Sequence, residues 1–292
     1  MPALALLAGR DRYERVMQGR VDCLHEDALT HTVRLTDDDR ALEAVVVALP
    51  PPAYLVRGAT LVPLAGRVAP SVVAGFATLA GVEMVGGLTR RTAEALGGGD
   101  GAALAVDAMI ELARLARQVT MMPRADAERA IGDPLAYRQL DMAGWTDLPD
   151  SCFTYSAAGR AHFDGRTVGA AAVPDLYSPH PGQRTVFERR KVARLARDDG
   201  RLRLFHSMHD NVHGFELTLD IDLASAKITR AEHVTPRLPY MGVCSEPQRR
   251  FAALVGETAD AGLRKRIQST LGGPDGCAQL YDLTSDVLKL LA

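Results

Sequence analysis

The chain has 292 residues, of which 47% are hydrophobic and 24% charged, and a formal net charge of −2. This composition is typical of a globular protein of about two domains and excludes a disordered chain. Because Lys and Arg are not in excess, a nucleic-acid partner is not expected. The apolar stretches 1–9 and 44–49 are far shorter than the roughly 20 residues of a membrane span, and the first lacks the positive start of a signal peptide. We therefore expect a cytoplasmic protein without a membrane partner.

The sequence repeats at an interval of about 175 residues. Residues 76–116 align with residues 251–291 without a gap, and 15 of the 41 positions are identical, where chance gives about three. The densest match places Leu96–Gly101 on Leu271–Gly276. Because the likeness extends upstream at nearly the same interval, we predict two copies of one module, a degenerate copy at 1–120 and a second copy at 185–292.

Alternation of apolar and polar residues predicts strands, and apolar spacing of three and four predicts helices. In chain order the first copy is expected to hold strands at Val45–Leu49 and Tyr54–Val62, then helices at Ser71–Leu79, at Thr89–Leu96 and from near Ala102. The second is expected to hold strands at Arg201–Phe205, Phe215–Ile221 and Lys227–Val234, then helices at Gln248–Val255, at Arg264–Leu271 and from near Cys277. Strands followed by helices indicate an α+β fold with antiparallel strands. Two such copies predict a pseudo-two-fold dimer within one chain.

Residues 121–184 match neither copy and are rich in Pro, Gly and Ala, but they include the only tryptophan, Trp145. We expect this connector to form irregular structure that packs on the two modules. Directly after it, the basic run Arg189–Lys191 suggests either the solvated face of a strand or helix, or a site for an anionic ligand.

Residues that only one copy has are the candidates for a functional site. In the alignment of the two copies, His213, Cys244 and Cys277 of the second correspond to Arg40, Ala69 and Ala102 of the first. Cys277 stands at a predicted helix start, where the helix dipole favours a thiolate. Two chemistries stay open: a three-ligand site for a transition metal such as zinc, and a metal-free Cys–His pair. The alternative without function is that both cysteines are buried packing residues.

Two nearby histidines extend the candidates. If Asp210-Asn211 forms a hairpin turn, His206 and His213 share one face of the sheet and His209 lies on the other. All three histidines are therefore not expected on one metal ion. The four cysteines form no Cys-x-x-Cys pair, so neither a disulfide framework nor a zinc knuckle is indicated.

The second copy resembles a bacterial family catalogued as domain of unknown function 2889. The motifs that carry the resemblance are Arg197–Gly200, His213 ahead of Leu217–Asp220, Pro239-Tyr240 with Cys244, Leu271–Gly273, and Gly276-Cys277 with Leu280. The family closes on Gly-Cys-Thr-His-Leu, and here Ala278 and Gln279 replace the Thr and the His. Leu148–Cys152 is similar to the family's Cys-His tail, with Phe153 in place of the His. The resemblance implies a polar cluster that includes His213, Cys244 and Cys277, with Cys152 as a further candidate.

These observations favour an enzyme of hydrolase or lyase type that acts on a small carbonyl or acyl-thioester metabolite. Cys277 would be the thiolate or a ligand, His213 the general base or a ligand, and Gln279 a hydrogen-bond donor to a developing oxyanion. The alternative is a non-catalytic protein that binds a ligand or stabilises a partner, because both copies have lost polar residues. The sequence is also compatible with a homo-oligomer.

Overall fold

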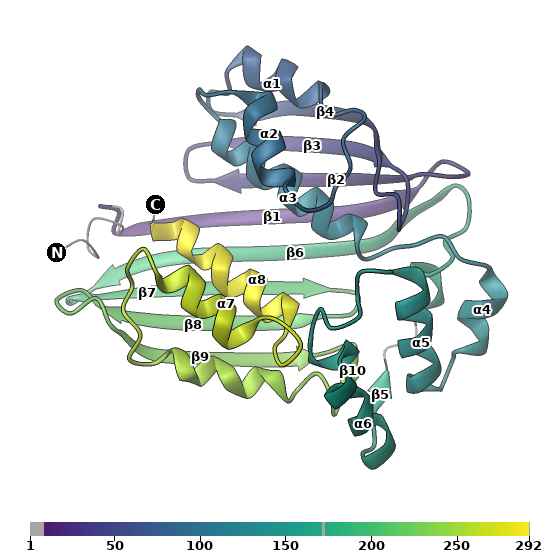
Figure 1. Cartoon of the computed structure of the whole chain (residues 1–292). Coiled ribbons are helices and arrows are strands. Elements are labelled where there is room, and N and C mark those ends of the chain that lie inside the picture. Colours follow the sequence, from purple (N-terminus) through teal and green to yellow (C-terminus); the bar gives the residue numbers. More distant parts are fainter. Residues whose placement is uncertain (1–8, 171–172, 292) are drawn as a thin grey trace.

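The computed structural model describes residues 9–170 and 173–291. Within them, eight antiparallel strands form one sheet in the order β4-β3-β2-β1-β6-β7-β8-β9 (Figure 1). The strands are β1 (Arg12–Cys23), β2 (Leu29–Asp37), β3 (Ala41–Ala48), β4 (Val56–Ala65), β6 (Gln183–Asp198), β7 (Arg201–Asp210), β8 (Gly214–Asp222) and β9 (Ile228–Arg237). The two four-stranded halves meet where β1 pairs with β6, with Met17 opposite Lys191.

The strands form because apolar residues alternate with polar ones. In β7, Leu202, Leu204, His206 and Met208 are buried, while Arg201 and Arg203, which alternate with the first of them, are exposed. Side chains on a strand point to opposite faces in turn, so this pattern covers one face of the sheet and leaves the other in solvent.

Helices cover that one face. In Figure 1, α1 (Pro70–Ala77), α2 (Leu88–Leu96) and α3 (Ala102–Ala116) lie over the first half of the sheet, and α7 (Leu263–Leu271) and α8 (Ala278–Val287) over the second. Helix α3 buries Met109, Leu112 and Leu115 against the sheet. Gly19 of β1 permits this approach, because a Cβ at that position would lie 2.8 Å from Leu115. The α+β class and the antiparallel sheet are therefore confirmed.

The connector has more regular structure than its composition indicated. It contains α4 (Arg124–Arg129), α5 (Pro134–Gly144), α6 (Ala157–Gly165), the 3₁₀ turns η2 (Phe153–Tyr155) and η3 (Pro174–Leu176), and β5 (Gly169–Ala170), which pairs with β10 (Tyr240–Met241). The Asp133 side chain caps α5 by accepting hydrogen bonds from the N–H groups of Leu135 and Ala136, and Ser156 caps α6. Figure 1 places these helices beyond one end of strands β6–β9.

The predicted strands and helices of both halves are present at nearly the predicted positions. Two differences stand out. Residues 247–254 form a 3₁₀ helix, η4, instead of an α-helix, and strands β1, β2 and β6 were not predicted. A last 3₁₀ turn, η5 (Leu288–Leu291), follows α8. Among residues 9–170 and 173–291, none of the helices combines the length and the apolar character that crossing a bilayer requires.

Candidate functional site

A cavity of about 260 Å³ lies where the connector meets the second half of the sheet. Its walls come from the β7–β8 turn, the segment after β9, the start of α8, and helix α5 with η2 of the connector. All the predicted site residues line it: His213, Cys244, Cys277, Gln279 and Cys152. Residues that are distant in the sequence therefore share one pocket.

His213 is held in place by Asp210 across the β7–β8 turn. The Asp210 N–H donates to the His213 carbonyl oxygen at 2.9 Å, and Asp210 Oδ1 accepts from the His213 backbone N–H at 2.6 Å. The same oxygen lies 3.2 Å from His213 Nδ1. Because the carboxylate occupies Nδ1, Nε2 is the ring nitrogen available for proton transfer. The turn residues are Asn211 and Val212, one position later than predicted.

Asp210 also neutralises a buried arginine. Arg189 Nη2 lies 2.7 Å from Asp210 Oδ2, and both side chains are almost fully buried. Burial opposes ionisation of Asp210, but His213 and Arg189 outweigh it and hold the pKa of this carboxyl well below its usual range. Arg189 in turn donates to Gln118 Oε1 at 2.9 Å, which ties the turn to the residues after α3.

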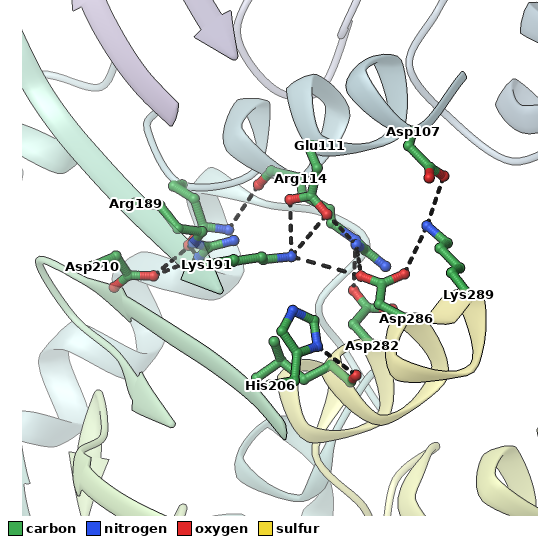
Figure 2. A network of polar contacts seen from close by, with 12 residues as sticks. Asp107, Glu111, Arg114, Arg189, Lys191, His206, Asp210, Asp282, Asp286 and Lys289 are labelled. Carbon is green, nitrogen blue, oxygen red and sulfur yellow. Dashed lines mark hydrogen bonds and ion pairs between the residues drawn. The ribbon is translucent and has the colours of Figure 1, made fainter. Parts of the chain in front are cut away.

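A buried ionic network lies beside this group between α3, β6 and α8 (Figure 2). Lys191 Nζ is 2.9 Å from Glu111 and 3.8 Å from Asp286. Arg114 contacts Glu111, Asp282 and Asp286. Burial and Arg114 lower the pKa of Lys191 against the attraction of Glu111. The prediction that the basic run 189–191 lies on a solvated face is wrong for Arg189 and Lys191, because their side chains point under the helices and are neutralised there.

The remaining histidines lie as the hairpin argument predicted. His206 is buried, and its Nδ1 is 2.9 Å from the Leu283 carbonyl oxygen. His209 points to the other face and lies 3.3 Å from Glu216. Neither lines the cavity.

Three cysteines line the cavity; Cys244 is buried, and Cys152 and Cys277 are half-buried. Cys244 Sγ is 3.0 Å from Thr154 Oγ1, and Cys277 caps α8 by accepting from the Leu280 N–H at 3.5 Å. The Phe153 N–H donates to the Gly276 carbonyl oxygen at 2.8 Å, which brings Cys152 next to Cys277. Burial raises the pKa of Cys152 to about 11 and raises the pKa of Cys244 and Cys277.

The raised pKa of Cys277 corrects the expectation of a stabilised thiolate. The helix start is present, but desolvation of the sulfur outweighs the backbone hydrogen bonds at α8. Within the described ranges, no three His, Cys, Asp or Glu side chains are grouped so that they could hold a metal ion. His213, Cys244 and Cys277 therefore share a pocket without forming the three-ligand site considered above.

A second polar group in the cavity was not predicted. The buried carboxylate of Asp141, on α5, accepts hydrogen bonds from Tyr155 at 2.8 Å, from Tyr177 at 2.6 Å and from Tyr240. Burial raises the pKa of Asp141, against the opposing effect of these three bonds, and raises the pKa of each phenol. No local motif unites these residues, because they come from α5, η2, the residue after η3 and β10.

The comparisons with known proteins concern the second half of the chain. A family model described as protein of unknown function (DUF2889) matches residues 192–291. Neither a curated protein nor a solved structure matches the chain. The match contains His213, Cys244, Cys277 and Gln279 but excludes the connector with Asp141 and Cys152. Residues 192–291 are thus similar to this family of unknown function, and the rest of the cavity comes from outside the matched segment.

Proposed function

We propose that the cavity is the active site of an enzyme that acts on a small carbonyl compound or acyl thioester, with His213 as its acid–base group. The observation that carries this proposal is the Asp210–His213 pair at the wall of a pocket that Tyr137, Trp145 and Tyr177 also line. A buried carboxylate that fixes one imidazole nitrogen leaves the other to take up and return a proton.

For a thioester, His213 Nε2 would take a proton from water as the water oxygen bonds to the acyl carbon. The sulfur would then leave and receive that proton, which gives a carboxylic acid and a thiol. The Gln279 side-chain amide, which also lines the cavity, supports this step as a donor to the oxyanion. Cys277 enters as a neutral thiol, and an attacking role for it would require His213 to deprotonate it first.

The test is turnover of a panel of N-acetylcysteamine thioesters and simple aldehydes by the wild type and by His213→Asn. We expect the variant to lose about 10²- to 10⁴-fold in kcat/KM. His209→Asn is the matched control, because His209 lies near the same turn on the opposite face. Activity that survives in His213→Asn would overturn the proposal.

A second candidate is a ligand-binding protein without catalysis. The specific observation in its favour is that burial raises the pKa of Cys152, Cys244 and Cys277 and so leaves the cavity without a thiolate at neutral pH. Binding of panel compounds without any His213-dependent turnover would support it. The proposed chemistry routes no step through a metal.

We also infer that the two halves are diverged copies of one module. The pairing of β1 with β6 supports this: an offset of 174 residues carries Met17 onto Lys191, and these two residues pair with each other. When a strand pairs antiparallel with its own copy across a two-fold axis, the residue at the axis pairs with its equivalent in the other copy.

The residues of the ionic network are related between the two halves by nearly the same offset. An offset of 175 residues carries Asp107, Glu111 and Arg114 onto Asp282, Asp286 and Lys289. Arg114 lies 3.2 Å from Asp282, and its counterpart Lys289 lies 2.8 Å from Asp107. Lys191 lies between the counterpart carboxylates Glu111 and Asp286, which supports a pseudo-two-fold axis at that lysine.

A further inference from the structure

The connector wall of the cavity carries two buried polar groups without a hydrogen-bond partner among the described residues. They are the Tyr137 hydroxyl and the Trp145 Nε1–H, whose residues are 1% and 6% exposed and line the cavity. Unpaired buried donors are rare, because each has given up its bonds to water. A ligand that supplies an acceptor would satisfy both groups.

The other polar groups of this wall already have partners. Asp141 accepts from Tyr155, Tyr177 and Tyr240, so the hydrogens of these three phenols are occupied. The charge of Asp141 is also balanced in part by Arg138, one turn earlier on α5. The wall therefore does not favour a cationic ligand. Its unpaired groups are hydrogen-bond donors, which require an acceptor atom on the ligand.

The size and shape of the cavity restrict the ligand further. A dry cavity of about 150 Å³ holds benzene, and this one measures about 260 Å³. The Trp145 and Tyr177 rings meet edge to face with centroids 5.6 Å apart, and the Tyr137 and Tyr177 centroids are 5.7 Å apart. Aromatic walls of this kind favour a flat ring that stacks or meets them by its edge. One substituted aromatic ring therefore fits in the space.

We propose that the cavity binds one-ring aromatic compounds with a carbonyl oxygen, and that Tyr137 and Trp145 donate hydrogen bonds to that oxygen. This inference rests on the proposed function, because it assigns a substrate class to the same cavity. Asp141 contributes by fixing the orientation of the three phenols that complete the wall.

The test is calorimetric titration with three probes of similar size. Acetophenone has both the ring and the oxygen, ethylbenzene lacks the oxygen, and cyclohexyl methyl ketone lacks the flat ring. We expect acetophenone to bind about fivefold more tightly than ethylbenzene, which corresponds to one net hydrogen bond. It should also bind more tightly than cyclohexyl methyl ketone, because only a flat ring stacks on the aromatic side chains. Because Trp145 is the only tryptophan, a change in its fluorescence on binding locates the ligand.

Tyr137→Phe removes one of the two donors and keeps the ring, so it should lower the acetophenone-to-ethylbenzene ratio while Trp145 remains as the other donor. Tyr54→Phe is the matched control: its hydroxyl is also buried and without a partner among the described residues, but Tyr54 does not line the cavity. The control should keep the wild-type ratio. Trp145→Phe provides a second donor deletion with the same expected direction.

Equal binding of acetophenone and ethylbenzene, or a preference that Tyr137→Phe and Trp145→Phe both leave intact, would overturn this inference. The proposed function fails separately. If His213-dependent turnover persists for non-aromatic substrates while the oxygen preference is absent, the function holds and the substrate class is wrong. If the preference is present but no turnover depends on His213, the binding site holds and the enzyme assignment is wrong.

Discussion

The buried pair of Asp210 and Arg189 allows a sharp test, because the chain contains a matched pair in its first half. Asp37 stands at the end of β2 as Asp210 does at the end of β7, and its Oδ1 accepts from the Arg40 N–H at 2.8 Å. Arg15 lies 3.9 Å from Asp37, with side chains 21% and 8% exposed, whereas Arg189 and Asp210 are 1% and 0% exposed. The same Asp→Asn change can therefore be made at a buried and at a partly exposed pair.

Asp210→Asn keeps the shape of the side chain and its bond to the backbone but leaves the Arg189 charge buried without a counterion. Removing one partner of a buried ion pair costs about 3–5 kcal/mol, and removing a partner of an exposed pair costs about 0–1 kcal/mol. We expect Asp210→Asn to lower the free energy of unfolding by about 3 kcal/mol. Asp37→Asn should lower it by about 1 kcal/mol, because Arg15 keeps Asp107 at 2.6 Å as a counterion and is not left with an unpaired charge.

Urea unfolding followed by Trp145 fluorescence and by circular dichroism measures both losses. Adding Arg189→Met to Asp210→Asn removes the uncompensated charge, so more than half of the loss should return. Equal losses in the two single variants, or no recovery in the double variant, would refute the argument from burial.

Two further predictions concern titration. Burial lowers the pKa of His206 to about 4. The unfolded chain therefore takes up a proton that the folded chain does not, and stability that is full above pH 6.5 is lost as the pH falls toward 4, by about 3 kcal/mol. His206→Gln should abolish this part of the pH dependence in urea unfolding and His209→Gln should not; the same acid loss in all three proteins would contradict the assignment. Because the pKa of Cys152 is about 11 instead of 9.0, its thiolate fraction at pH 8 should be about a hundredfold below that of an ordinary thiol. Alkylation of Cys152 by iodoacetamide, followed by mass spectrometry, should be slow when the protein is folded and normal in urea. Fast labelling of the folded protein would contradict the raised pKa.

The sequence predicted elements well where periodicity was regular. The alternation around Phe215–Ile221 and the helical spacing of Arg264–Leu271 each correspond to an element in the structure. Strand β6 was missed because charged residues occupy buried positions in it, at Arg189 and Lys191. Their partners lie on β7, α3 and α8, so only the tertiary structure shows why a strand can bury them.

The site was predicted in part for a related reason. His213, Cys244 and Cys277 were found because they differ from Arg40, Ala69 and Ala102 in the first half. Asp141, Tyr155 and Tyr177 had no counterpart in the first half with which to be compared, since the connector occurs once. Comparison between the halves could therefore identify the sheet side of the cavity but not the connector side.

The position of the connector explains why the cavity around His213 lies in the second half. In the first half, the Ala69 N–H donates to the Asp100 carbonyl oxygen at 2.9 Å, and Arg40 lies 3.8 Å from Asp100, so the turns close on one another. In the second half, η2 of the connector lies between the corresponding segments: Thr154 contacts Cys244, and Phe153 binds the Gly276 carbonyl oxygen. The connector holds these segments apart and adds α5, with its aromatic wall, as the far side of the pocket. The chemistry proposed for His213 therefore depends on a segment outside the residues that match the family, and a protein with the matched residues alone would present His213 without this pocket.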